Sequence, residues 1–385
     1  MSHRTRTLAI VLAGGAGSRM GPLTETRAKP ALPFAGLYRL IDFALSNCAN
    51  SRIRDVWVLQ QHRPHSLEDH LANGRPWDLD RTAGGLLILH PFSGGDEGGL
   101  QQGNADALWR HQSLIAEFDA DVVLVLSADA VYTLDYRDLV DAHLGSGADV
   151  TMATTRVDED PGRFGVVEVG ADGRVTGFQY KPDEPAGDVV TMEVFAYRPA
   201  ALLATLEELA KENDGELSDF GDGLIPRLVD DGRAHEHRFD GYWRDVGTPQ
   251  SYWQAHQDLL TGGTRGMDLD DPAWPIRTTG AHRPPARFDP SASVENSLVS
   301  PACRVSGRVV DSVLSPGVIV EEGAVVEGAV VLHDAVIHSG ARVRQAILDA
   351  RVEVPGWATV QSDDPENPVA VVGSDHDDVL SDGAV

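Results

Sequence analysis

The chain has 385 residues, 42% of them hydrophobic, which is enough for two domains that each bury a core. Its formal net charge of −27 argues against nucleic acid as a partner, because a protein that binds polyanions needs a basic surface. The first apolar run, Leu8 to Ala13, is too short for a signal-peptide core, so we expect a cytoplasmic protein without a membrane segment.

A glycine-rich turn and two cations follow this apolar run, in the sequence LAIVLAGGAGSRMGPLTETRAKP. The residues that matter are Gly14, Gly15, Gly17, Arg19 and Lys29. The glycines allow a sharp turn whose N–H groups converge on anionic oxygens, and the two side chains add positive charge. The segment therefore predicts a cradle for a nucleoside triphosphate or pyrophosphate.

Spacing excludes two common phosphate-binding patterns. The Walker A pattern places its lysine directly after the last glycine, whereas Lys29 lies twelve residues beyond Gly17. The dinucleotide fingerprint requires a third glycine at the position of Met20.

Farther along the chain, apolar runs alternate with segments of helical periodicity. The runs are Val56–Leu59, Val122–Leu126 and Val150–Thr154, and the helical segments are 42–50, 106–117 and 136–144. This alternation predicts an α/β domain with a Rossmann-like, mostly parallel sheet. Ligands bind beyond the carboxyl ends of such strands, where we expect both the glycine turn and Asp129.

Three further residues have ordinary explanations beside functional ones. Asp129 is placed to bind a metal ion but is also a common residue in turns. Asp245 could pair with Arg244 or cap the next helix. Lys181 follows a predicted hairpin formed by 166–169 and 175–178, where a lone lysine is usually a solvated charge.

From about residue 291 aliphatic residues recur every six positions. They are Ile319, Val325, Val331, Ile337 and Val343, with Val318, Ala324, Val330 and Val336 beside them. A period of six predicts a β-helix, whose coils are stable only as a stack.

Several motifs then occur in a fixed order along most of the chain. Beyond the glycine turn they are LIDFALSNC (40–48), GNADAL (103–108), SDFGDGLIP (218–226), YWRDVGT (242–248), WPIRT (274–278) and PPARF (284–288). Together they resemble bacterial ADP-glucose pyrophosphorylases, a family of sugar-phosphate nucleotidylyltransferases. The resemblance implies a Mg²⁺-dependent enzyme that joins glucose 1-phosphate to ATP and releases pyrophosphate.

The resemblance also implies a domain order and an assembly. We expect a nucleotidyltransferase catalytic domain over 1–260, a linker over 261–290, a left-handed parallel β-helix of hexapeptide repeats over 291–360 and an acidic flexible tail over 361–385. In the family the β-helix serves oligomer contacts and regulation, and the expected assembly is a homotetramer.

Site residues follow from the resemblance at the positions that match its motifs. The expected catalytic residues are Arg19, Lys29 and Asp129. The expected nucleotide-binding residues are Leu12, Ala13, Gly14, Gly15, Gly17, Gln61, Gly103 and Asp129. The expected sugar-phosphate-binding residues are Gly165, Tyr180, Lys181, Glu193, Ser218 and Asp219. The expected Mg²⁺ ligands are Asp129 and Asp245.

For such a reaction the protein mainly has to position the two substrates and supply positive charge. The oxygen of a sugar phosphate is already ionised and attacks the α-phosphorus without a general base. What the site must overcome is repulsion between anions, which Mg²⁺ and fixed cations reduce.

The chain departs from the family pattern around the expected sugar. Tyr180 stands where the family has Glu, and Glu193 where it has Gly. Ala128 and Ala130 replace the residues beside the metal aspartate, and Asp222 replaces a lysine. A pocket built for hydroxyls rejects analogues strongly, so a rearranged pocket also fits another polyol phosphate.

Two alternatives therefore remain open from the sequence. One is the same chemistry on a valienol-type cyclitol 1-phosphate, with ATP or another nucleotide, in pseudo-sugar natural-product biosynthesis. The other is a non-catalytic regulatory subunit. The nucleotide base, the allosteric effectors and the choice between glycogen biosynthesis and secondary metabolism are not determined by the sequence.

Overall fold

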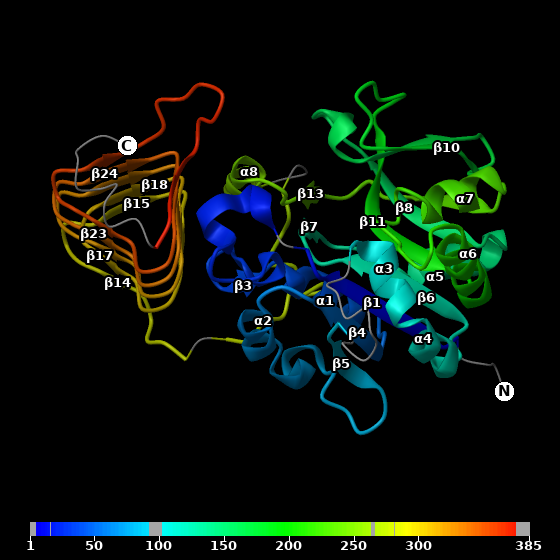
Figure 1. Ribbon diagram of the computed structural model, residues 1–385. Helices are drawn as coiled ribbons and strands as arrows, with labels where there is room; N and C mark the ends of the chain where they lie inside the picture. Colours follow the sequence, from blue (N-terminus) through cyan, green and yellow to red (C-terminus); the bar gives the residue numbers. More distant parts are fainter. Residues whose placement is uncertain (1–4, 16, 92–101, 263–265, 281, 375–385) are drawn as a thin grey trace.

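The computed structural model describes residues 5–15, 17–91, 102–262, 266–280 and 282–374. It has two parts, an α/β domain and a stack of short parallel strands (Figure 1). The predicted α/β fold followed by a parallel β-helix is confirmed.

The main sheet of the α/β domain has the strand order β10-β9-β11-β6-β1-β4-β5; β8 also pairs with β11, and β12 pairs with β8. The strands are β1 (Thr7–Ala13), β4 (Asp55–Gln60), β5 (Gly85–Leu89), β6 (Val122–Ser127), β8 (Val150–Arg156), β9 (Gly165–Val169), β10 (Val175–Tyr180), β11 (Val189–Tyr197) and β12 (Ala234–Arg238). Neighbours from β5 to β6 pair in parallel, whereas β11 runs antiparallel to β6 and β8.

The sequence of β1 explains its central place. Leu8 and Ile10 pack into a hydrophobic cluster on one face of the sheet, and Ala9 and Val11 into a cluster on the other. A strand that is buried on both faces needs a continuous apolar run, which β1 has.

Helices cover both faces. They are α1 (Ile41–Asn50), α2 (Pro64–Leu71), α3 (Asn104–Arg110), α4 (Gln112–Phe118), α5 (Tyr136–Ser146), α6 (Pro199–Glu212), α7 (Leu224–Asp230) and α8 (Pro249–Thr261). Short 3-10 helices are η1 (Ser18–Thr24), η2 (Lys29–Ala31), η3 (Ala72–Trp77) and η4 (Pro161–Arg163), and the short strand pairs are β2 (Pro33–Phe34) with β3 (Tyr38–Arg39) and β7 (Ala130–Tyr132) with β13 (Trp243–Asp245).

The single helix expected over 106–117 is two helices, α3 and α4. His111 separates them with φ −103° and ψ 9°, outside the helical region. Its ring Nδ1 lies 2.8 Å from the Ala107 carbonyl oxygen, so a side chain takes part in the hydrogen bonding at the break. Apolar periodicity does not report such a bond.

The described residues of the second part form three parallel sheets, one for each side of a β-helix (Figure 1). Their strands are β14 (Arg287–Phe288), β15 (Ser293–Glu295), β16 (Leu298–Val299), β17 (Arg304–Val305), β18 (Arg308–Val310), β19 (Val313–Leu314), β20 (Ile319–Val320), β21 (Val325–Glu327), β22 (Val330–Val331), β23 (Val336–Ile337), β24 (Arg342–Arg344), β25 (Ala346–Leu348), β26 (Glu353–Val354), β27 (Thr359–Val360) and β28 (Ala370–Val372).

The predicted aliphatic ladder is displaced by one residue in two strands. Val331, Ile337 and Val343 are fully buried as expected, but Ile319 and Val325 are only half-buried. Their neighbours Val320 and Val326 fill the core instead. Successive side chains of a strand point to opposite faces, so a shift of one residue exchanges inside and outside.

The ends of the β-helix differ from the expected bounds. β14 lies before residue 291 and pairs with β17. β28 lies inside the segment expected to be a flexible tail, yet it pairs with β25 and buries Ala370 and Val372. The sequence did not predict this strand because its short apolar stretch is surrounded by acidic residues. Residues 375–385 of the expected tail lie outside the described residues.

The β-helix packs against the α/β domain through a shared apolar cluster. Phe34 and Tyr252 of the α/β domain belong to the same buried cluster as Val330 and Ile347 of the β-helix. Trp253 on α8 also donates its indole N–H to the Gly328 carbonyl, at 2.7 Å. Within the described ranges, no helix has the length and apolar character that crossing a membrane requires.

Candidate active site

A cavity of about 260 Å³ opens at the carboxyl edge of the main sheet, where β1 and β4 end. Its lining residues are Leu12, Gly14, Gly15, Leu59, Gln61, His62, Gln102, Gly103, Asn104, Ala107 and Asp219. Five of the predicted nucleotide-binding residues are in this set, together with Asp219, which we expected on the sugar side. Sequence reasoning missed Leu59, His62, Gln102, Asn104 and Ala107, although their closeness to Gln61 and Gly103 in the sequence was a usable signal.

The glycine turn connects this cavity to a buried lysine. Gly17 has φ 66°, a conformation that side chains other than glycine rarely adopt. A Cβ added there would lie 3.0 Å from Lys29 Cβ and 3.1 Å from Thr24 Cγ2. By contrast, a Cβ on Gly15 would meet nothing within 4 Å, so Gly15 borders open space. Ala13, the last residue of β1, is buried behind the turn; Ala16 lies outside the described residues.

Lys29 and Asp129 form a close ion pair. Lys29 Nζ lies 2.7 Å from Asp129 Oδ2, and the Ser127 hydroxyl donates to Asp129 Oδ1. Burial favours the neutral carboxyl, but the Lys29 ammonium and the hydrogen bonds outweigh it and lower the pKa of Asp129. Burial likewise opposes the charge on Lys29, and the two nearby aspartates nevertheless raise the pKa of Lys29.

Asp245 lies beside Asp129 because β13 pairs with β7. Asp245 is opposite Ala130 in that pairing, and the Val246 N–H donates to the Asp129 carbonyl oxygen at 3.1 Å. Burial, together with the negative charge of Asp129, raises the pKa of Asp245 to about 6, while Lys29 and Arg19 oppose this rise. The structure thus brings together four of the predicted residues, Arg19, Lys29, Asp129 and Asp245.

The Arg19 guanidinium is exposed and borders the two aspartates. A Cβ added to Gly247 would lie 2.6 Å from Asp245 Oδ2 and 3.4 Å from an Arg19 terminal nitrogen. A side chain at 247 would therefore displace the Asp245 carboxylate oxygen, whereas the Arg19 nitrogen would be in ordinary contact. Lys29 and Arg19 form a pair of cations next to the carboxylates.

Glu193 projects from an irregular part of β11. The register of β11 against β8 shifts between Thr191 and Phe195, and Glu193 has φ 56°. Burial and repulsion from Asp129 and Asp245 raise the pKa of Glu193 to about 8. Its carboxyl group has no hydrogen-bond partner among the side chains and backbone groups that the structure describes, so it is available to a ligand.

The two aspartates fit a Mg²⁺ ion. Burial and, after it, the negative charge of Asp129 raise the pKa of Asp245, and a divalent cation bound by both carboxylates would offset this unfavourable charge. Within the described residues no group of three His, Cys, Asp or Glu side chains is arranged to hold a metal. Mg²⁺ usually takes one or two carboxylates and completes its octahedron with water and phosphate oxygens, so two aspartates are sufficient.

Three of the predicted sugar-phosphate residues are linked by hydrogen bonds, with Tyr180 in the middle. The Tyr180 hydroxyl donates to Asp219 Oδ2 at 3.1 Å and accepts from Lys181 Nζ at 2.7 Å. Burial, followed by the charges of Asp219 and Glu193, raises the pKa of Tyr180, so the phenol stays protonated. Lys181 is exposed and has φ 47°.

The remaining predicted residues have mainly structural contacts. A Cβ on Gly165 would lie 2.8 Å from the Phe178 ring, so Gly165 is small for packing. A Cβ on Gly103 would lie 2.3 Å from the Ser218 backbone carbon, so the backbones of Gly103 and Ser218 approach each other closely. The Ser218 hydroxyl donates to Asp222 Oδ2 at 2.8 Å.

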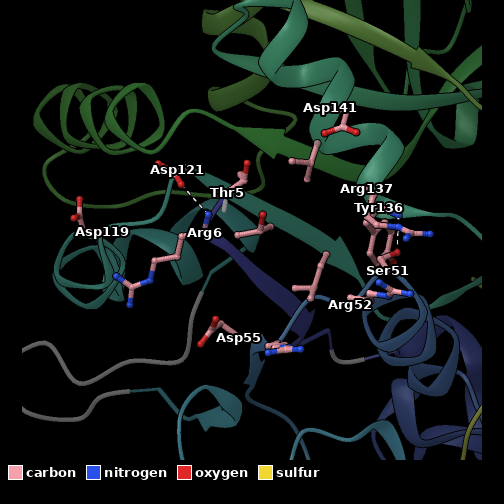
Figure 2. Close-up of a pocket in the computed structure, with 14 residues that line it drawn as sticks. Thr5, Arg6, Ser51, Arg52, Asp55, Asp119, Asp121, Tyr136, Arg137 and Asp141 are labelled. Atoms are coloured by element: carbon pink, nitrogen blue, oxygen red, sulfur yellow. Dashed lines mark hydrogen bonds between the residues drawn. The ribbon is translucent and has the colours of Figure 1, made fainter. Parts of the chain in front are cut away.

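A wider cavity, of about 880 Å³, lies at the opposite edge of the sheet, where β1, β4 and α5 begin (Figure 2). Its charged lining residues are Arg6, Arg52, Arg54, Arg137, Asp55, Asp119, Asp121 and Asp141. Positive and negative side chains are equal in number here, and none of the predicted site residues lines this cavity. We therefore assign it no chemistry.

Comparison with known proteins agrees with this division of the chain. Residues 8–262 match the nucleotidyl transferase family model, and residues 284–373 match that of the GlmU-like C-terminal hexapeptide. The chain is 45% identical over 324 residues to a glucose-1-phosphate adenylyltransferase of Thermotoga maritima. The matched segment covers 83% of this chain and 76% of that protein.

Two other relatives carry the same name. The chain is 45% identical over 338 residues to the glucose-1-phosphate adenylyltransferase of Thermomicrobium roseum, covering 81% of this chain and 78% of that protein. It is 37% identical over 356 residues to the glucose-1-phosphate adenylyltransferase of Acetivibrio thermocellus, and the matched segment covers 91% of this chain and 83% of that protein.

Proposed function

The chain belongs to the nucleotidyl transferase family, and on that premise we propose that it joins glucose 1-phosphate to ATP, giving ADP-glucose and pyrophosphate. The observation that carries the proposal is the arrangement of the glycine turn. Gly14 and Gly15 border the cavity, while Gly17 packs on Lys29, which pairs with Asp129. A nucleotide in the cavity would thus present its phosphates to the cations and carboxylates.

The nucleotide side of the site rests on the cavity-lining residues. We propose that the base and ribose of ATP occupy this cavity, where the Gln61 amide offers both a donor and an acceptor. The backbone of Gly14 and Gly15 would carry the phosphates. Arg19 and Lys29 would offset the negative charge on the α-phosphoryl group and on the departing pyrophosphate.

Enzymes of this family generally use a divalent metal ion, and for this chain we propose Mg²⁺ held by Asp129 and Asp245. When bound, the ion would supply positive charge at the α-phosphate. Lys29 would then exchange part of its contact with Asp129 for a phosphate oxygen, because Nζ contacts the carboxylate while Cβ of the same side chain lies close to Gly17 of the glycine turn.

On the sugar side, Lys181 would hold the phosphate of glucose 1-phosphate. Glu193, with its unpaired carboxyl group, would contact a hydroxyl of the ring. An oxygen of the sugar phosphate attacks the α-phosphorus, a new P–O bond forms, and the bond to the β-phosphate oxygen breaks with release of pyrophosphate. Since the attacking oxygen is already ionised, no side chain needs to remove a proton.

The two alternatives from the sequence are not favoured. Relatives at 37–45% identity are named for glucose 1-phosphate and adenylyl transfer, and the residues expected for catalysis are all present. The cyclitol substrate has no support beyond the departures at Tyr180 and Glu193. A homotetramer and a cytoplasmic location remain predictions.

The test is pyrophosphate release from the purified protein with Mg²⁺, across a matrix of nucleoside triphosphates against glucose 1-phosphate and several cyclitol 1-phosphates. The proposal predicts the highest kcat/KM for ATP with glucose 1-phosphate. A clear preference for a cyclitol phosphate would replace the proposed substrate, and no release with any pair would favour the non-catalytic subunit.

A further inference from the structure

A chain of hydrogen bonds joins the nucleotide cavity to the sugar-phosphate lysine. The Asn104 N–H donates to Asp219 Oδ1 at 3.1 Å, and the Tyr180 hydroxyl donates to Asp219 Oδ2 at 3.1 Å. Lys181 Nζ donates to the Tyr180 hydroxyl oxygen at 2.7 Å. One carboxylate thus holds a backbone group of the cavity with one oxygen and a phenol with the other.

The cavity end of this chain is tightly packed. Gly103, Asn104 and Asp219 all line the cavity. A Cβ on Gly103 would lie 2.5 Å from the Asp219 backbone nitrogen, and the Ala105 N–H donates to the Ser218 carbonyl at 3.1 Å. A ligand that presses on the start of α3 would therefore also move or fix Asp219.

The ring of Tyr180 is held on several sides. It stacks on Phe178 with 6.5 Å between ring centroids and 16° between planes, and meets Phe220 edge-on at 6.2 Å. A Cβ on Gly221 would lie 2.2 Å from the ring. With the ring fixed, the direction of its O–H bond depends on Asp219.

The phenol holds the Lys181 ammonium in position. A phenol has one proton, and because that proton goes to Asp219, its oxygen can only accept from Lys181. The ammonium also lies 4.3 Å from the Tyr180 ring centroid. This hydrogen-bond partner is a neutral phenol rather than a carboxylate, so it orients the ammonium without forming an ion pair with it, and the Lys181 backbone has φ 47°.

We propose that Tyr180 is a positioning residue that couples the nucleotide cavity to Lys181, so that nucleotide and sugar 1-phosphate strengthen each other's binding. Nucleotide binding fixes Asp219, Asp219 fixes the Tyr180 hydroxyl, and the hydroxyl fixes the Lys181 ammonium. The inference rests on the proposed function for the identity of the two ligands. Coupling of this kind is reciprocal and typically amounts to about 5- to 150-fold in affinity.

The test measures this coupling in the Tyr180→Phe variant, which keeps the ring and removes the hydroxyl. The probe is α,β-methylene-ATP with Mg²⁺, because its α–β linkage cannot be cleaved and no turnover occurs. Its Kd is measured by calorimetry with and without saturating glucose 1-phosphate. We expect glucose 1-phosphate to lower this Kd at least about fivefold in the unmodified protein and not at all in Tyr180→Phe.

Tyr242→Phe is the matched control. The Tyr242 hydroxyl also donates to an aspartate, Asp258 Oδ2 at 2.9 Å, but contacts neither the cavity nor Lys181. It should keep the full coupling. Asp219→Ala removes the hydrogen-bond acceptor of the Tyr180 hydroxyl and should lose the coupling. This variant replaces Tyr180→Phe in the test if Tyr180→Phe is poorly folded.

The possible outcomes distinguish a failure of the proposed coupling from a failure of the proposed function. Undiminished coupling in Tyr180→Phe, or no coupling in the unmodified protein despite binding of both ligands, would overturn the inference alone. Failure of the unmodified protein to bind either ligand would instead count against the proposed function.

Discussion

Lys29 Nζ lies 2.7 Å from Asp129 Oδ2, so a fixed cation already neutralises one of the two carboxylates that would hold the metal ion. The same lysine packs on Gly17 of the glycine turn, which we propose binds the nucleotide phosphates. One side chain therefore connects the proposed phosphate site with the proposed metal ligands.

Replacing Lys29 by Gln should lower kcat by about 10²- to 10³-fold, the usual cost of losing one preorganised group that stabilises developing charge. The pKa of Asp129 should rise because its counter-charge is gone. Steady-state kinetics of pyrophosphate release measure the first effect. Lys29→Arg, which keeps the charge, should retain more activity than Lys29→Gln, and equal losses in both variants would contradict a charge role.

Gly17→Ala should destabilise the fold by about 1–2 kcal/mol, because alanine pays that much in the left-handed region. The added Cβ also meets Lys29 Cβ at 3.0 Å, so activity should fall with stability. Gly15→Ala is the control, since its Cβ meets nothing within 4 Å. Urea unfolding of both variants makes the comparison. Equal destabilisation by the two substitutions would count against the conformational argument.

Glu193 should make the unliganded protein less stable at alkaline pH. Its folded pKa, raised to about 8 by burial and by Asp129 and Asp245, exceeds the ordinary value of 4.5. The folded state therefore binds the proton more tightly than the unfolded state, and this stabilisation is lost as pH rises from about 4.5 through about 8.

The measurement is urea unfolding at pH 5.5 and pH 9 for the unmodified protein and for Glu193→Gln. The unmodified protein should lose more stability between these two values, because glutamine does not titrate. Identical losses would show that Glu193 is not buried near the aspartates in solution.

Lys181→Ala should raise the KM for glucose 1-phosphate far more than it lowers kcat, because a ground-state contact to the phosphate is lost. Any change in the KM for ATP should be smaller. Two-substrate initial-rate kinetics separate the constants. Equal increases in the two KM values would contradict the assignment of Lys181 to the sugar phosphate.

The fold was largely predictable because its signals are local. The buried run of β1 and the six-residue period of the β-helix both depend on side-chain pattern alone. The break at His111 and the strand β28 were not predicted, because apolar periodicity reports neither the bond between the His111 ring and the Ala107 carbonyl nor the pairing of β28 with the distant strand β25. Periodicity also could not decide whether Ile319 or Val320 points inward.

The sequence named residues that the structure brings together, but it did not indicate the contacts between them. Asp129 and Asp245 are 116 positions apart in the sequence, and only the pairing of β7 with β13 brings them together. The hydrogen bond from Tyr180 to Asp219 could not be predicted either, because the two residues lie in different motifs and neither motif indicates a contact with the other. Asp219 lines the proposed nucleotide cavity and also accepts a hydrogen bond from the Tyr180 hydroxyl.

The most direct test of the central claim is ADP-glucose formation from ATP and glucose 1-phosphate as Mg²⁺ is titrated, in the unmodified protein and in Asp129→Asn. We predict product only when the metal ion is present, and near-complete loss in the folded Asp129→Asn variant. Product formation that persists in Asp129→Asn or in excess EDTA would contradict the proposed site, and absence of product from the unmodified protein would contradict the proposed reaction.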